Sequence, residues 1–444
     1  PCFCDVPPFD VLWNESSSTH ARARHVVWFW ASQETPCFCD APPFHAALPI
    51  FSLFRHSTND KPEYMDTQPR YLLANIGGEE SHRDQNKLIK HPAVTHLGEL
   101  WLLSMGARGT IERPQPIANY GPLSKWAHQG TGLMAWFASP TSEKTALEIN
   151  SKHMGPDSKY VQNVHNKGFA AKLAIEIGKP EGWEYSHVIH KIDGPKEAEQ
   201  ALKKILDEWP DWAKENFTLK PCMGSAGRGR IAGKKSKLTT QHFQGLYKMT
   251  LRGGAIIEPW YSTIDNLSTQ LMVHQDGTFD ILGHTSQILT TSGTYLGNYG
   301  SIKLGQIQSG TEHDDMLNLR ARDITPIISQ NKFFGVCGFD SFTFQCPTSE
   351  QSRLRSPLEV NARFTSATVG IGYIQEMMTQ ADFQNGSWIF ILDADKDWCS
   401  HAQKQDNWSV KIVTTPTTQK NALFAICPDK QAMERWLVAI GLKN

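Results

Sequence analysis

Two carboxylates and an amide in the second half of the chain have the types and spacing of a magnesium site. Asp340 lies in the run GFDSFTF, and Glu359 and Asn361 lie in LEVNAR, after a polar hairpin. Alternate side chains of a strand share a face, so Glu359, Asn361 and Arg363 are predicted on one face, with Asp340 on a neighbouring strand. Hard oxygen ligands of this kind suit Mg²⁺. An exposed sheet face is the alternative, although acids and asparagine are poor strand residues.

A glycine-rich turn follows an apolar strand in the segment FTLKPCMGSAGRGR, residues 217–230. Glycine lets successive backbone N–H groups converge on an anion, and Lys220 at the strand end adds a positive charge. The segment predicts a phosphate-binding loop containing Gly224, Ser225, Gly227 and Gly229. A flexible hairpin would have the same composition. The turn is neither a Walker A loop nor a Rossmann fingerprint, because Gly-Lys-[Ser/Thr] is absent and no amphipathic helix opens directly on it.

Two further acids lie in the segment AIIEPWYSTID, residues 255–265. Glu258 ends an apolar strand, and Asp265 follows after a proline and two aromatic residues. A carboxylate at the first position can accept a hydrogen bond from an adenine amino group, and one at the second can accept from ribose hydroxyls. An ordinary solvated strand end is the alternative interpretation of Glu258.

Hydrophobic periodicity predicts a mixed framework of helices and strands around these motifs. Apolar residues at helical spacing predict amphipathic helices over residues 167–177 and 195–209, and another near residues 432–440. From residue 217 the pattern changes to strands separated by glycine turns. The predicted strands are 71–76, 255–258, 268–274, 278–284, 335–345 and 358–361.

The bulk composition describes a globular chain with no strong charge of its own. It has 444 residues, of which 40% are apolar and 20% charged, and its formal net charge is −1. This length predicts two or three packed units, and the charge gives no field that would recruit nucleic acid or an acidic membrane. The apolar run 26–31 is far shorter than the roughly 20 residues of a membrane span. We therefore expect no nucleic-acid or membrane partner and a cytoplasmic location.

The first 64 residues look different from the rest. Residues 1–9, PCFCDVPPF, return as PCFCDAPPF at residues 36–44, and no methionine precedes Met65. We interpret residues 1–64 as an unstructured or non-native extension. Its two Cys-x-Cys pairs, Cys2/Cys4 and Cys37/Cys39, could alternatively bind zinc, although the usual Cys-x-x-Cys spacing is missing.

Taken in order, these motifs resemble the ATP-grasp superfamily, in particular its D-alanyl-D-alanine ligase branch. That branch has a lysine before the glycine loop, two acids seven residues apart and an Asp…Glu-x-Asn metal set. The matching residues here are Lys220, Glu258, Asp265, Asp340, Glu359 and Asn361. Asn166-Lys167 looks like the family's earlier nucleotide-binding lysine. Within the superfamily, the GFD strand, the EVNAR ending and the NIGG opening are most similar to the pheganomycin-type peptide ligases. The resemblance covers roughly residues 68–444.

The resemblance implies an α+β fold in which two subdomains clasp ATP, between a small N-terminal α/β domain and a small C-terminal α+β domain. The implied boundaries are 65–150, 151–375 and 376–444. ATP and Mg²⁺ are the implied cofactors, with two metal ions and Mn²⁺ as an alternative. Nucleotide contacts are implied for Lys167, Lys220, Gly224, Ser225, Gly227, Gly229, Glu258, Trp260 and Asp265, and metal contacts for Asp340, Glu359 and Asn361.

One departure from the D-alanine ligases concerns the acyl intermediate. Those enzymes have an arginine two residues before the metal-binding aspartate, where this chain has Gly338. The corresponding catalytic cation is therefore expected to be Arg363, with Arg228 or Arg230 as alternatives.

The implied activity is ATP-dependent, ADP-forming ligation of a carboxylate to an amine through an acyl phosphate, on an amino acid, peptide or related small acid. An ATP-grasp kinase would share every nucleotide and metal residue, as would a non-catalytic ATP-binding protein. Small-molecule or peptide substrates are the expected partners, and a homodimer is compatible with the family. We expect the acceptor pocket to involve residues 292–301 and the small N-terminal unit. A flexible glycine-rich connection is the alternative for residues 292–301.

Overall fold

Three β-sheets and the helices around them make up the part of the chain that the computed structural model describes. It describes residues 70–80, 90–126, 131–224, 227–290, 293–349 and 351–442, which belong to one compact unit. The predicted extension 1–64, its Cys-x-Cys pairs and Ser225 of the glycine loop lie outside these ranges. In the described ranges, no helix is long and apolar enough to cross a membrane.

The first sheet is small and has the strand order β2-β1-β3, with β1 parallel to β3. Trp101 and Trp136 pack edge to face beneath it, with ring centroids 5.8 Å apart. Strand β1 ends three residues earlier than the predicted strand 71–76, where the chain turns into the loop Asn75–Glu80. The elements of this region are β1 (Tyr71–Leu73), α2 (Pro92–Ser104), β2 (Gln115–Pro116), η1 (Ser124–Trp126), β3 (Leu133–Ala135), α3 (Pro140–Glu148), α4 (Ser158–His165) and α5 (Lys167–Glu176).

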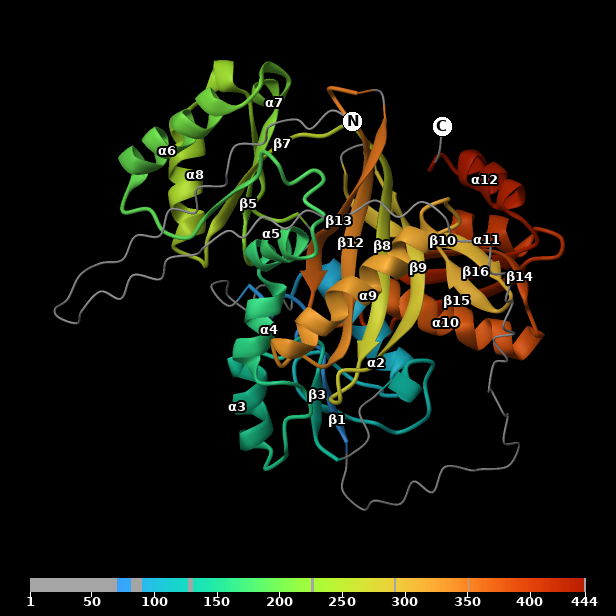
Figure 1. Ribbon diagram of the computed structural model, residues 1–444. Coiled ribbons are helices and arrows are strands. Elements are labelled where there is room, and N and C mark those ends of the chain that lie inside the picture. The colour runs from blue at the N-terminus through green and yellow to red at the C-terminus, as the bar shows by residue number, and fades with distance from the viewer. Residues whose placement is uncertain are drawn as a thin grey trace, which may run out of the picture. The chain divides into compact units, whose positions relative to one another are not determined.

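The second sheet is antiparallel and has the order β4-β7-β5-β6. Helices α6 and α8 lie beside it, and their apolar faces share a core with the strands (Figure 1). This core joins Leu202 of α6 and Leu246 of α8 to Phe217 and Ile257 of the sheet. The elements are β4 (His187–Ile189), α6 (Pro195–Glu208), α7 (Asp211–Glu215), β5 (Phe217–Pro221), β6 (Ile231–Gly233), η2 (Lys235–Lys237), α8 (Thr240–Thr250) and β7 (Ala255–Pro259).

The third sheet is the largest and has the order β13-β12-β8-β9-β10-β14-β16-β15, with β11 paired to β10. Residues 376–444, which the resemblance assigns to a separate domain, contribute β14, β15 and β16 to this same sheet. Its strands are β8 (Thr263–Val273), β9 (Phe279–Leu289), β10 (Tyr295–Lys303), β11 (Gln306–Gln308), β12 (Gly335–Gln345), β13 (Ser352–Asn361), β14 (Asn385–Ala394), β15 (Ser409–Thr414) and β16 (Asn421–Cys427).

Helices cover both faces of this sheet, and neighbouring residues of β8 show which helix lies on which face. Gln270 accepts hydrogen bonds from Thr365 and Thr368 at the start of α10. Thr269 points the other way, to His284, whose second ring nitrogen contacts Asn318 of α9. Helix α5 packs against β13. The helices of this region are α9 (Asp314–Gln330), α10 (Ser366–Ala381), α11 (Lys396–Gln403) and α12 (Lys430–Ala439).

Candidate functional site

The antiparallel register of β12 and β13 brings the three predicted metal ligands together. Asp340 lies directly opposite Glu359, and Gly338 lies opposite Asn361. The Asn361 side-chain amide donates a hydrogen bond to Oδ2 of Asp340 at 3.0 Å, which leaves its carbonyl oxygen to face a ligand. Two carboxylates and one amide oxygen therefore share one face of the sheet, as the strand alternation predicts.

Three ionisable side chains, those of Asp340, Glu359 and Lys167, lie close together at this point of the sheet. Burial, together with the nearby Glu359 carboxylate, raises the pKa of Asp340 to about 7. Burial would also raise the pKa of Glu359, but the attraction and hydrogen bond of the Lys167 ammonium outweigh it and hold that pKa at about 2. Lys167 forms an ion pair with Glu359 and donates to the Gly224 carbonyl at 3.2 Å. The predicted phosphate lysine thus connects the metal strands to the glycine loop.

A buried polar network, which the sequence did not reveal, orients Asp340. Ser268 donates to Oδ1 of Asp340 at 2.7 Å, and Gln287 donates to the same oxygen at 3.3 Å. Gln270 in turn donates to Ser268 at 2.8 Å. These residues come from β8 and β9, and only the pairing of β8 with β12 and of β9 with β8 places them beside the carboxylate.

The Gln270 side chain occupies the space above Gly338. A Cβ atom at Gly338 would lie 2.6 Å from the Gln270 Oε1 atom, closer than packed atoms allow. Gln270 is fully buried and fixed by Thr365 and Thr368. The space above Gly338 is therefore occupied by a neutral amide.

The donor set fits Mg²⁺. Within the described ranges, no group of three His, Cys, Asp or Glu side chains is arranged to hold a metal, so the Asn361 carbonyl is needed beside the two carboxylates. A divalent cation would also offset the repulsion that raises the pKa of Asp340. Oxygen ligands from two carboxylates and a carbonyl are typical of Mg²⁺, whose remaining positions are filled by water and substrate phosphate.

The predicted adenine contact, Glu258, lies in a buried ionic cluster. It pairs with Lys220 through one oxygen and with Arg355 through the other, the latter at 2.6 Å. Burial alone would raise its pKa, but the two cations hold it at about 2. Arg355 is fully buried, and its guanidinium lies 3.7 Å from the ring centroid of Trp183. Lys220 and Glu258 therefore contact each other across β5 and β7.

Asp265 and Trp260 lie nearby in the chain but in different settings. Asp265 is half-buried, and Thr343 of β12 bonds both its backbone N–H, at 2.9 Å, and its carboxylate, at 3.2 Å. Trp260 is 49% exposed, and the Arg230 guanidinium lies 4.8 Å from its ring centroid. Arg230 is thus held on an aromatic surface beside β7.

The glycine loop has the backbone conformation that glycine permits. Gly224, Gly227 and Gly229 have φ values of 153°, 66° and 79°. A Cβ atom at Gly227 would meet nothing within 4 Å, so the backbone conformation, rather than crowding, requires glycine there.

Two acids in the loop after β1 bind the other predicted catalytic arginines. Arg363 pairs with Glu79 at 3.3 Å, and Arg228 pairs with Glu80 at 2.8 Å. Both glutamates are at most 3% exposed. No predicted role falls on these glutamates, although the sequence shows them as two adjacent acids directly after the NIGG motif.

His165 is a further residue of this region that no sequence motif indicated. It ends α4, two residues before Lys167, and is 2% exposed. Neither ring nitrogen has a hydrogen-bond partner among the described residues, and the ring contacts Phe137 edge to face at 5.3 Å. Burial, reinforced by the Arg363 charge, lowers its pKa to about 3, so the ring is neutral. It is a buried polar group in need of a partner.

Cys222, beside the glycine loop, packs in a small apolar cluster with Ala170 and Trp183. It is fully buried, and burial raises the pKa of its thiol to about 12. A neutral thiol of this kind is a poor nucleophile.

Searches against known proteins give matches only among solved structures. No protein-family model matches the chain, and no curated protein matches it. The chain is similar to a biotin carboxylase from Campylobacter jejuni, in complex with β-γ-ATP, at 12% identity and a TM-score of 0.43, covering 69% of this chain and 73% of that one. It is also similar to two enzymes of N5-carboxyaminoimidazole ribonucleotide synthesis. The one from Aspergillus clavatus, complexed with ATP, has 12% identity, a TM-score of 0.46 and coverage of 73% and 90%. The one from Thermus thermophilus has 14% identity, a TM-score of 0.46 and coverage of 72% and 83%.

The predicted α+β class is confirmed by the helices and the mostly antiparallel sheets. Sequence identities of 12% to 14% assign no role to individual residues. The roles proposed below therefore rest on the contacts within this chain.

Proposed function

We propose that the chain is an ADP-forming, ATP-dependent carboxylate–amine ligase of the ATP-grasp type. The observation that carries this proposal is the Asp340–Glu359–Asn361 constellation, with Lys167 bound to it and Arg363 just beyond the end of β13. Residues 151–375 would form the ATP-grasp unit, and two Mg²⁺ ions would be held by Asp340, Glu359 and Asn361. Bound there, Mg²⁺ would neutralise charge on the transferred phosphoryl group.

Both predicted phosphate lysines are paired with carboxylates in this structure. Lys167 pairs with Glu359, and Lys220 pairs with Glu258. A nucleotide triphosphate offers these ammonium groups new anionic partners. The lysines would then bind phosphate oxygens, and Glu359 would become available as a metal ligand. The glycine loop, already bonded to Lys167 through Gly224, supplies backbone N–H groups on the same side.

In the proposed reaction, an oxygen of the substrate carboxylate attacks the γ-phosphorus, the bond to the β-phosphate oxygen breaks, and ADP leaves. The resulting acyl phosphate is a mixed anhydride, which an amine opens to give an amide, phosphate and a proton. Arg363 would stabilise the negative charge that develops on the acyl phosphate. Exclusion of water protects the anhydride, so no side-chain nucleophile is required.

The proposed substrates are an amino acid, peptide or related small acid and an amine of the same class, as in the pheganomycin-type peptide ligases that the motifs resemble. The test is a screen for ADP release over pairs of amino acids, short peptides and non-protein acids, with mass spectrometry of the products. We expect release that depends on both an acid and an amine, together with an amide product. A stable phosphorylated product without any need for an amine would show a kinase instead.

Site variants connect that activity to the constellation. Asn361→Ala and Glu359→Ala should abolish ADP release while the thermal unfolding transition is retained. Glu312→Ala is the matched control, because the Glu312 side chain is 87% exposed and distant from these strands in the chain. Full activity in both site variants, or no ATP turnover with any acid and amine, would refute the proposal.

A further inference from the structure

A cavity of about 180 Å³ lies beside β10, β11 and β14, and the strand alternation places it on the sheet face opposite the metal ligands. On β10, Asn298 points toward the metal side, where it bonds Thr285 of β9. The next residue, Tyr299, points to the other face and lines the cavity. The cavity is therefore separate from the candidate active site.

The floor of the cavity is a row of polar side chains in register across three strands. Ser301 of β10 is paired with Ser387 of β14 on one side and with Gln308 of β11 on the other. All three line the cavity. Hydroxyl and amide groups side by side offer both donors and acceptors to a small polar molecule.

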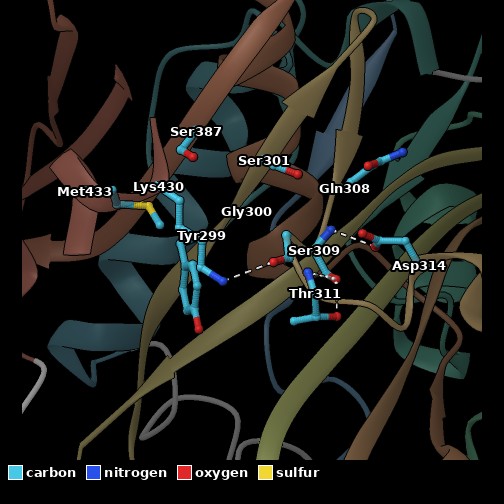
Figure 2. A pocket seen from close by; sticks show the side chains of 11 residues that line it. Tyr299, Gly300, Ser301, Gln308, Ser309, Thr311, Asp314, Ser387, Lys430 and Met433 are labelled. Carbon is cyan, nitrogen blue, oxygen red and sulfur yellow. Dashed lines mark hydrogen bonds between the residues drawn. The ribbon is translucent and has the colours of Figure 1, made fainter. Parts of the chain in front are cut away.

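Two side chains of opposite charge, Lys430 and Asp314, line different sides of the cavity (Figure 2). On one wall Lys430, at the start of α12, donates to the Gly310 carbonyl at 3.2 Å. On the other wall Asp314, at the start of α9, accepts from the Ser309 backbone N–H at 2.8 Å and is 8% exposed. Within the described ranges, no carboxylate pairs with Lys430 and no cation pairs with Asp314. Thr311 lies between the two charged groups in the view.

We propose that this cavity is a second, non-catalytic binding site for a free α-amino acid. The ligand carboxylate would bind Lys430, its ammonium group would bind Asp314, and the hydroxyl row would complete the hydrogen bonds. Tyr299 and the buried Met433 provide an apolar side for a small side chain. The volume suits this class, because a cavity of about 150 Å³ accommodates benzene, whereas drug-sized ligands need roughly 300 Å³ or more.

The proposal is independent of the ligase activity and can be tested on the full chain by calorimetric titration. Glycine, L-alanine and L-serine serve as zwitterionic probes, and acetate and methylammonium serve as probes with one charge each. We expect at least one amino acid to bind. Each single-charge probe should bind about tenfold more weakly or not at all, because it can pair with only one of the two charged groups, Lys430 or Asp314.

Two variants locate the binding site. Lys430→Gln removes the cation, and Ser301→Leu fills the cavity from a half-buried position. Each should weaken amino-acid binding about tenfold or more, since a charge-assisted contact or the available volume is lost. Lys404→Gln, on an exposed lysine after α11, is the matched control. Thermal unfolding confirms that each variant is folded.

The active-site variant Asn361→Ala separates this site from the catalytic one. Amino-acid binding should be unchanged in that variant and in the presence of saturating MgADP. Four results would overturn the proposal: no binding of any amino acid, equal binding of acetate, an unchanged stoichiometry and affinity of amino-acid binding in both cavity variants, or binding lost in Asn361→Ala. Absence of ligase activity would leave this result standing, because the titration needs no turnover.

Discussion

Arg363, just beyond the end of β13, and Glu79, in the loop after β1, form a buried ion pair with 3.3 Å between Nε and Oε1. The arginine side chain is 11% exposed and the glutamate side chain 1%. Arg363 also donates to the Phe364 carbonyl at 2.9 Å. The guanidinium is therefore fixed from two sides before any substrate arrives, which lowers the cost of ordering it later.

Because Arg363 is held in place, the substitution Arg363→Lys tests whether its guanidinium group stabilises the acyl phosphate. A lysine keeps the charge beside Glu79 but loses the planar fork that binds two oxygens at once. We expect kcat for ADP release to fall by about 10²–10³, the usual loss when one donor to a developing anion is removed. Arg322→Lys is the control, because Arg322 is exposed on α9 and is not among the predicted site residues. Equal losses in the two variants would contradict a specific role for Arg363.

Removal of the metal should be visible without turnover. Nucleotide that binds only the folded chain raises Tm, and we expect MgADP to do so through the Asp340 and Glu359 carboxylates. Addition of EDTA should remove most of that rise, and Asn361→Ala should do the same with Mg²⁺ present. A Tm rise that is insensitive to EDTA would argue against a metal at this constellation.

Glu258→Gln should destabilise the chain, because it leaves Arg355 and Lys220 with a buried positive charge. Breaking a buried ion pair on one side costs about 3–5 kcal/mol in the free energy of unfolding. Urea unfolding at pH 7 measures this cost. Glu148→Gln is the control, since the Glu148–Lys144 pair is exposed and should change stability by about 0–1 kcal/mol.

The same comparison has a defined pH dependence. The folded pKa of Glu258 is about 2, below its ordinary 4.5, so its contribution to stability is fully present above pH 4.5. The difference between the wild type and Glu258→Gln should shrink as pH falls from 4.5 toward 2. A constant difference over that interval would show that the carboxylate is not held ionised.

The sequence predicts those parts of the site whose residues are close in the chain. The predicted strand 335–345 has the same bounds in the structure, and a hairpin returns β13 beside it with Glu359 opposite Asp340. Strand alternation and one hairpin suffice for that geometry. The predicted strand 358–361 is only the end of β13, which begins at Ser352, because its polar first half carries no apolar signal.

The rest of the site depends on pairings between distant segments. Ser268 and Gln287 reach Asp340 only because β8 lies next to β12 in the sheet and β9 next to β8, which is not their order in the chain. Glu79 reaches Arg363 from the loop after β1, which belongs to a different sheet. No local periodicity encodes such contacts, so these residues looked like ordinary polar positions.

Gly338→Ala tests whether Gln270 needs the space above the glycine. The added Cβ would lie 2.6 Å from Gln270 Oε1, so we expect a loss of about 1–3 kcal/mol in stability and weaker MgADP binding. The double variant with Gln270→Ala removes the obstructing side chain. If Gly338→Ala costs as much in that background as in the wild type, the two residues are not coupled.

His165→Leu should separate stability from activity. The folded pKa of His165 is about 3, below its ordinary 6.5, so protonation of the unfolded chain destabilises the wild type as pH falls from 6.5 to 3. The difference in the free energy of unfolding between the leucine variant and the wild type should therefore shift by about 2 kcal/mol in favour of the variant between pH 8 and pH 5. We also expect slower ADP release, because the ring lies beside Arg363 and Lys167. If ADP release were unchanged, the unpartnered nitrogens of His165 would have no role in the activity.

The place of β14, β16 and β15 in the large sheet has a practical consequence for shortening this protein. These strands continue the hydrogen-bonded ladder from β10 outward. A chain that stopped at residue 375 would leave one side of β10 as a bare edge, with backbone N–H and C=O groups ready to pair with another molecule. The last 70 or so residues thus cover this edge, and we expect shortened versions that lack them to self-associate.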